Sequence, residues 1–168
     1  DRAFDHAVEF LNFGAGEWST CNQAFRGARN CAFSATDVPV LGPTCTNMEL
    51  AFEDCDGLLD YDFTGWDVST ITNMRGLFAA ANFTGDLSSW DVSQVTNMSS
   101  MFSQSSAFNG DLSNWDVSNV TNMNGMFYRA YAFNSDISSS INSSSNISST
   151  SSSTNSSTSS TSSSSNSS

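Results

Sequence analysis

The sequence predicts an α/β solenoid, in which repeat units of about 25 residues stack along one axis. Trp-Asp-Val-Ser recurs at residues 66–69, 90–93 and 115–118, at a spacing of 24 and then 25 residues. Thr-Asn-Met follows each copy, and its methionine precedes a phenylalanine by four residues. A unit of this length cannot bury its own apolar face, so stacking on its neighbours must make the core.

Residues 1–20 are predicted to form a helical cap on the first unit. Phe4, Ala7, Val8 and Leu11 have the i, i+3, i+4, i+7 spacing of an apolar helix face, and Gly14 lies where the helix would end. A cap is expected because an uncapped solenoid exposes both its core and a strand edge.

The repeat is predicted to occupy residues 21–137. Met48 and Cys21 each stand four residues before a phenylalanine, so the methionine column extends back to Cys21. In the other direction the apolar positions end at Ile137, and Ser140 stands where the next tryptophan would fall. The array therefore holds about four to five coils.

Each coil is predicted to contain a short strand, a short helix and a turn. In residues 87–108, Trp90 and Val92 alternate as in a strand, and Thr96 is placed as the N-cap of a helix. Apolar residues within 98–105 then follow helical spacing. Stacked right-handed, the strands would form one parallel sheet with the short helices opposite.

The repeated side chains have structural explanations. The tryptophans at 66, 90 and 115 could form a sugar-stacking ladder, but burial with the indole N–H bonded internally is favoured. The methionines at 74, 98 and 123 are predicted to fill the core rather than bind metal. The Thr-Asn pair before each is predicted to satisfy backbone groups at the corner of the coil.

Aspartates in register would place like charges one coil apart, at Asp67, Asp91 and Asp116. Hydrogen bonds from turn N–H groups are the favoured compensation, and bound cations are the alternative. The densest acidic patch does not have EF-hand spacing, so no cofactor is predicted and calcium is the alternative there. This patch consists of Glu53, Asp54, Asp56, Asp60 and Asp62.

Four cysteines lie in the first third of the chain, and their even number favours disulfides in an oxidising compartment. No Cys-x-x-Cys or histidine pattern supports a zinc site. Cys21 and Cys45 are 24 residues apart, as are Cys31 and Cys55, so each pair can meet across neighbouring coils. This pairing is favoured, and a local Cys21–Cys31 bridge is the alternative.

The composition argues against several classes of protein. With a net charge of −12 and no lysine, the surface would repel nucleic acid and anionic lipid. No run of 18 apolar residues could span a membrane. A chain that begins at Asp1 suits a secreted protein after removal of its signal peptide. The carboxylates recur with the repeat instead of standing in singular environments, and no catalytic triad or phosphate loop is found, so no enzyme is predicted.

Residues 138–168 are predicted to be a low-complexity tail, since they contain only Ser, Thr, Asn and two isoleucines. The tail is expected to be an O-glycosylated stalk, with Thr150, Thr154, Thr158 and Thr161 as candidate sites. Asn82 and Asn119 are the better N-glycosylation candidates, because Asn97 is expected to serve the corner of its coil. The remaining sequons are those of Asn142, Asn146, Asn155 and Asn166.

The unit Trp-Asp-Val-Ser-x-Val-Thr-Asn-Met-x-x-Met-Phe, with Ala-Phe-Asn-Gly-Asp-Leu after it, resembles BspA-type leucine-rich repeats of surface proteins. The resemblance is specific over residues 63–137, moderate over 46–62 and weak before that. It implies a leucine-rich-repeat-like fold and a secreted or surface-attached interaction protein, often an adhesin, without enzymatic activity.

Two functions fit these expectations: a glycosylated subunit that assembles with copies of itself into an extracellular filament, or an adhesin that binds a host or matrix ligand. The exposed sheet positions vary little from repeat to repeat, which favours the structural subunit. We expect head-to-tail assembly, because an open end that docks on the opposite end of the next copy does not close. The residues expected to take part are Phe4, Val8, Leu11 and Phe13 at one end and Phe133 and Ile137 at the other.

Overall fold

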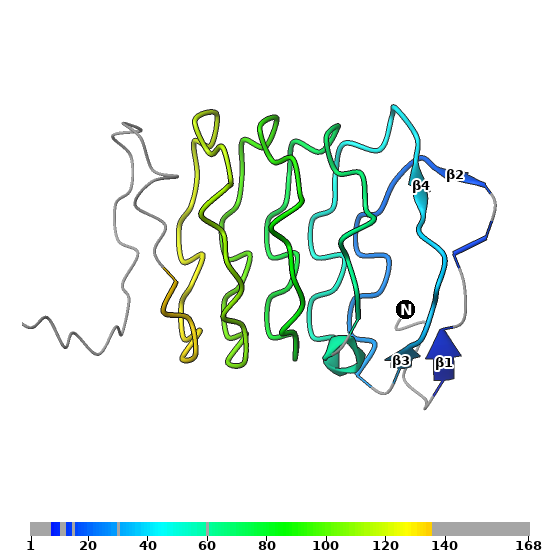
Figure 1. The fold of residues 1–168 in the computed structure, drawn as a ribbon, viewed down its shortest axis with the longest axis horizontal. Helices are drawn as coiled ribbons and strands as arrows, with labels where there is room; N and C mark the ends of the chain where they lie inside the picture. Colours follow the sequence, from blue (N-terminus) through cyan, green and yellow to red (C-terminus); the bar gives the residue numbers. More distant parts are fainter. Residues whose placement is uncertain (1–7, 11–12, 15, 30, 60, 136–168) are drawn as a thin grey trace, which may run out of the picture.

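The computed structural model describes residues 8–10, 13–14, 16–29, 31–59 and 61–135. Most of this chain is neither helix nor strand, and it encloses a large buried aromatic core. Successive units lie side by side, from the blue N-terminal end to the yellow C-terminal end (Figure 1).

Strands are short and lie at the N-terminal end. Strand β1 (Val8–Phe10) pairs in parallel with β3 (Cys31–Phe33), and β2 (Glu17–Trp18) pairs in parallel with β4 (Val40–Leu41). The 3-10 helix η1 (Asp56–Leu58) follows. These are two separate two-stranded sheets. The prediction of one parallel sheet is therefore wrong for the described part of the chain.

The first 20 residues also differ from the prediction. Strands β1 and β2 lie within the segment expected to be a helical cap, and β1 covers part of the expected helix. Both strands pair with residues about one repeat further along, so this segment belongs to the first repeat unit. Residues 1–7 and 11–12 of the expected helix lie outside the described residues, as does the tail from residue 136.

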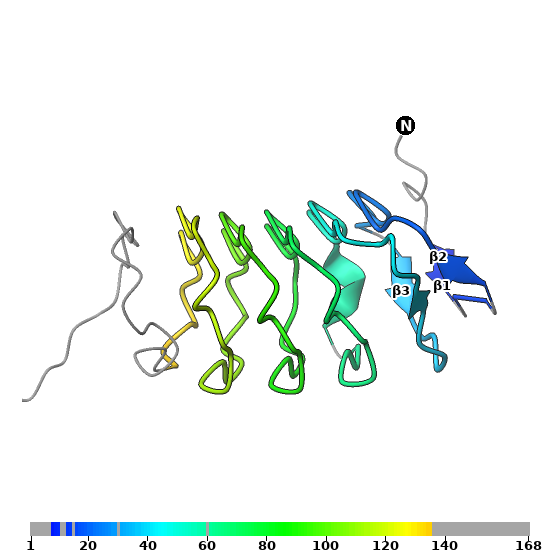
Figure 2. The same cartoon turned by 90° about the horizontal axis from the view of Figure 1, so that it is seen from above.

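The methionine-to-phenylalanine stretch of each unit is a run of tight turns. We call these stretches turn segments and number their positions 1 to 8; they comprise residues 21–28, 48–55, 74–81, 98–105 and 123–130. In every segment the N–H of position 4 donates to the carbonyl of position 1, and the N–H of position 6 donates to that of position 3. Seen from above, the segments line one edge of the stack (Figure 2).

The short helices predicted at these segments are absent from the described residues, and the reason is backbone conformation. Positions 3 and 7 of every segment have positive φ, as at Ser100 (56°) and Gln104 (63°). A left-handed residue interrupts an α-helix. The apolar positions were predicted correctly as a set, because the tight turns direct Met98, Met101, Phe102 and Ser105 inwards just as a helix would. Thr96 is consequently not a helix cap.

Neighbouring turn segments are joined by a regular backbone ladder. The N–H groups of positions 3, 5 and 7 donate to the carbonyls of positions 2, 4 and 6 in the next segment, over 2.6–2.9 Å. This pattern repeats at all four junctions between the five segments. Parallel bridges also run through Asn47, Asn73, Asn97 and Asn122, which confirms the alignment of the repeats.

Aromatic columns fill the interior. Phe25, Phe52, Phe78, Phe102 and Phe127 occupy position 5 of successive segments, and their rings stack with centroids 5.3–5.8 Å apart and planes within 10°. A second stacked column contains Phe83, Phe108 and Phe133. Each ring inside a column therefore stacks on its counterparts in the units before and after it, and each end ring on one counterpart, which is how units too small to fold alone share one core.

Candidate functional site

The cysteines predicted to pair are brought together across units in one case. The sulfur atoms of Cys21 and Cys45 are buried and lie 3.3 Å apart, and both residues are thiols in this structure. Burial raises the pKa of the Cys21 thiol, and its hydrogen bond with Cys45 adds to this rise. The geometry places these two residues within reach of a disulfide and leaves the bond itself a prediction.

The second predicted pair is described only in part. Cys55 is buried, and its thiol donates to the carbonyl of Ala28 over 3.7 Å. Cys31 lies in β3, which packs against η1, the helix that directly follows Cys55. The two backbone segments are thus neighbours, and the side chain of Cys31 lies outside the described residues.

The aspartates in register are held by their own turns. The Ser N–H two residues later donates to one carboxylate oxygen of Asp67, Asp91 and Asp116, over 3.0–3.1 Å. Hydrogen bonds from the Ser93 hydroxyl and N–H lower the pKa of Asp91, although Asp67 and Asp116 oppose this. The favoured prediction of hydrogen bonding is confirmed. Among the described residues, no group of three or more acidic, Cys or His side chains could hold a metal ion.

The Thr-Asn pairs satisfy backbone groups, as predicted. The hydroxyls of Thr72, Thr96 and Thr121 each donate to the carbonyl of the equivalent threonine one unit earlier. The amide oxygens of the following asparagines accept an N–H two residues later. The threonine hydroxyls therefore add side-chain hydrogen bonds between neighbouring units to those that the backbone makes.

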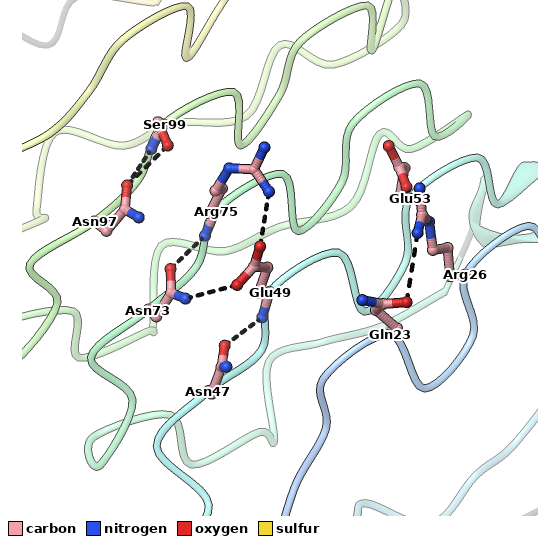
Figure 3. A network of polar contacts seen from close by, with 9 residues as sticks. All are labelled: Gln23, Arg26, Asn47, Glu49, Glu53, Asn73, Arg75, Asn97 and Ser99. Carbon is pink, nitrogen blue, oxygen red and sulfur yellow. Dashed lines mark hydrogen bonds and ion pairs between the residues drawn. The ribbon is translucent and has the colours of Figure 1, made fainter.

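Ion pairs also cross between units (Figure 3). Glu49 accepts hydrogen bonds from Asn73 and from Arg75, over 3.1 and 2.7 Å. Arg26 pairs with Glu53 one unit further on. Another such pair joins Arg29 to Asp54. Glu53 and Asp54 of the predicted acidic patch thus bind arginine, which favours a structural role for these two carboxylates over a calcium site.

The tryptophans are buried, as predicted. The indole N–H groups of Trp90 and Trp115 donate to the carbonyls of Phe63 and Leu87, each over 3.0 Å. The indole N–H of Trp66 is also buried. With side chains 3–4% exposed, these rings are inaccessible to a stacking sugar.

Three candidate glycosylation sites lie in the described residues. Asn82 is exposed, and none of its side-chain atoms takes part in a hydrogen bond. Asn119 is exposed, but its amide donates to the carbonyl of Ser93 over 2.7 Å. Asn97 is half-buried and holds Ser99 through its amide oxygen, as expected for a corner residue. The candidates in the tail lie outside the described residues.

The residues predicted to mediate assembly have mixed placements. Phe13 is 7% exposed and packs edge-on against Trp18, Phe25 and Trp66, so it belongs to the core of its own chain. Phe133 is half-buried and stacks on Phe127. Val8 lies in β1, and Phe4, Leu11 and Ile137 lie outside the described residues.

Sequence analysis expected an open end but did not identify its residues: in the described chain, the ladder has unpaired backbone groups at both ends. Within the described chain, the N–H groups of Gly125, Phe127 and Arg129 in the last turn segment have no hydrogen-bond partner. At the first turn segment the carbonyls of Asn22, Ala24 and Arg26 likewise have no hydrogen-bond partner among the residues that the structure describes. The only sequence signal for them is their place at the two ends of the repeat.

Over residues 46–166 the sequence matches the family described as Mycoplasma protein of unknown function, DUF285. The chain belongs to the DUF285 family. The matched region takes in four of the five turn segments and extends through most of the serine-rich tail. Comparison with curated proteins and with solved structures gives no match. No helix among the described residues is long and apolar enough to cross a membrane.

Proposed function

We propose that this DUF285 chain is a non-enzymatic extracellular structural protein, a glycosylated subunit that assembles head to tail into a filament at or outside the cell surface. The unit would be a right-handed, leucine-rich-repeat-like solenoid related to BspA-type surface repeats. The observation that carries the proposal is the open ladder at the last turn segment, where Gly125, Phe127 and Arg129 present unpaired N–H groups. Such an edge is a template for another chain.

The monotony of the surface supports a structural role over an adhesin. The exposed aspartate and the serine of the Trp-Asp-Val-Ser motif are the same in each of its three copies, and their polar groups are engaged: Asp67, Asp91 and Asp116 each accept a bond from their own turn. A selective binding site needs polar groups that can turn to a ligand. Copies of the chain are therefore the favoured partner.

Measurement of assembly size tests the proposal. Full-length protein is expected to show a weight-average mass that rises with concentration in sedimentation velocity, and filaments in negative-stain images. A monodisperse monomer over the whole concentration range would contradict it. Protein from its natural source is expected to exceed the bare mass of 18.0 kDa because of attached glycans. Among the described sequons, Asn82 is the expected site, because its side chain is exposed and makes no hydrogen bond.

A further inference from the structure

The two open ends of the ladder are complementary, and this fixes how one copy can dock on the next. At each internal junction, positions 3, 5 and 7 donate and positions 2, 4 and 6 of the following segment accept. The last segment has three free donors, at Gly125, Phe127 and Arg129. They occupy positions 3, 5 and 7 of the last turn segment. This segment therefore offers the donor half of a fifth junction.

The other half lies at the first turn segment. Its free acceptors are the carbonyls of Asn22, Ala24 and Arg26, at positions 2, 4 and 6. Asn22 and Arg26 are exposed and Ala24 is half-buried, so this row is open to solvent. From these rows, and resting on the proposed self-assembly, we infer that residues 123–130 of one copy dock in register on residues 21–28 of a second copy and continue the backbone ladder.

Side chains at the two ends match in the same register. Tyr128 stands at position 6 and Tyr131 three residues later, and both are exposed, 44% and 69%. The equivalent positions of the first segment hold Arg26 and Arg29, whose side chains are 49% and 53% exposed. The Tyr128 ring already has the guanidinium of Arg129 of its own chain 5.1 Å from its centroid. Docking would place a guanidinium of the second copy beside each tyrosine ring, which is a favourable cation–π pair. In the column of position-5 rings, Phe127 of one copy would lie against Phe25 of the second copy, which stacks with Trp18.

Charge substitutions at Tyr128 separate this register from general electrostatics. The chain carries a net charge of −12, so general repulsion between copies predicts that Tyr128→Arg strengthens association and Tyr128→Glu weakens it. The inferred register predicts the reverse, because the new side chain would lie beside Arg26 and Arg29 of the second copy. Their ion-pair partners, Glu53 and Asp54, lie one unit further from the docking face. We expect Tyr128→Arg to weaken association about tenfold, which corresponds to the loss of one partly desolvated cation–π pair.

Leu59 supplies the matched control, since it is 42% exposed and lies between the turn segments 48–55 and 74–81, outside the first and last segments. Full-length Leu59→Arg and Leu59→Glu variants are measured beside the Tyr128 pair by sedimentation velocity, with circular dichroism to show that all four fold. If Tyr128→Arg changes the association of the chains in the same way as Leu59→Arg does, the inferred register is wrong and the proposed function still stands. A wild-type chain that stays monomeric would overturn both.

Discussion

At the residue scale, each unit depends on two backbone positions that an L-residue adopts only at a cost. Positions 3 and 7 of the turn segments have positive φ, and glycine occupies only some of them, as at Gly76 (60°). Others hold Leu50, Ala80 or Ser100. The left-handed conformation costs a non-glycine residue about 1–2 kcal/mol. The repeated donors of the ladder require this conformation, so packing between units must offset the cost.

Adding a Cβ at one left-handed position of the segment 74–81 and removing the Cβ at the other should therefore change the free energy of unfolding in opposite directions. Gly76→Ala is expected to lower the free energy of unfolding by about 1–2 kcal/mol, because φ is 60° and the new Cβ would stand 2.5 Å from Leu50 Cδ2. Ala80→Gly, with φ of 53°, is expected to raise it by up to about 1 kcal/mol. Chemical denaturation of both variants measures this, and an equal effect of the two would contradict it.

The aspartate columns give the stability of the fold a pH dependence of known sign. Hydrogen bonds from the Ser hydroxyl and N–H two residues later lower the pKa of Asp67 and Asp116, as they do for Asp91. A carboxyl group whose pKa is lower in the folded state stabilises the fold above its unfolded pKa of about 3.9. This contribution is lost as the pH falls through the lower, folded-state pKa.

Thermal unfolding should consequently show a midpoint that drops as the pH is lowered below about 4. Ser69→Ala removes the hydroxyl that donates to Asp67 over 2.6 Å, so the pKa of Asp67 is expected to move up towards its ordinary value, which an NMR titration of the carboxyl carbon can follow. Asp111, held by Ser113, serves as the internal reference that should not move. A shift of both groups by the same amount would argue against a local cause.

At the scale of the element, the sequence predicted which residues face inwards better than it predicted the secondary structure. The apolar spacing at 98–105 is common to a helix and to successive tight turns, because both return to the same side every three to four residues. The backbone propensities of serine and glutamine do not indicate that Ser100 and Gln104 have positive φ. The hydrogen bonds that decide between the two run to the next unit, and their ends at Gly125 and Asn22 can be found only from the structure.

The junction between the first two units should be strengthened by oxidation. A disulfide between Cys21 and Cys45, whose sulfur atoms lie 3.3 Å apart, would close a loop of about 24 residues and add on the order of 3 kcal/mol. Non-reducing peptide mapping of secreted protein is expected to link these two cysteines. Denaturation with and without reductant then measures the gain. If oxidation stabilises a Cys45→Ser variant by the same amount, this assignment is wrong. It is also wrong if a peptide joins Cys21 to Cys31.

At the scale of the whole molecule, the contacts are nearly identical from junction to junction. Each junction has the same three backbone bonds, and each adds a ring to the position-5 column, as Phe78 and Phe102 do. Stability in such a stack is approximately a sum of unit and nearest-neighbour contributions. Within the backbone ladder, the first and last turn segments differ from the internal ones by lacking one neighbour, so the same hydrogen bonds that hold the units together could join two copies.

Removal of one whole unit should accordingly leave a folded protein. Deleting residues 82–105 joins Ala81 to Ser106 and brings the segment at 74–81 beside that at 123–130, where Gly76 can donate to Asn124 as it now donates to Ser99. We expect cooperative thermal unfolding at a lower midpoint, because one junction is lost. Deleting residues 82–93 removes half a unit and throws the ring and hydrogen-bond columns out of register, so this control should not fold cooperatively. If the two deletions unfold alike, the junctions are not interchangeable, and a filament built by repeating them between copies loses its physical basis.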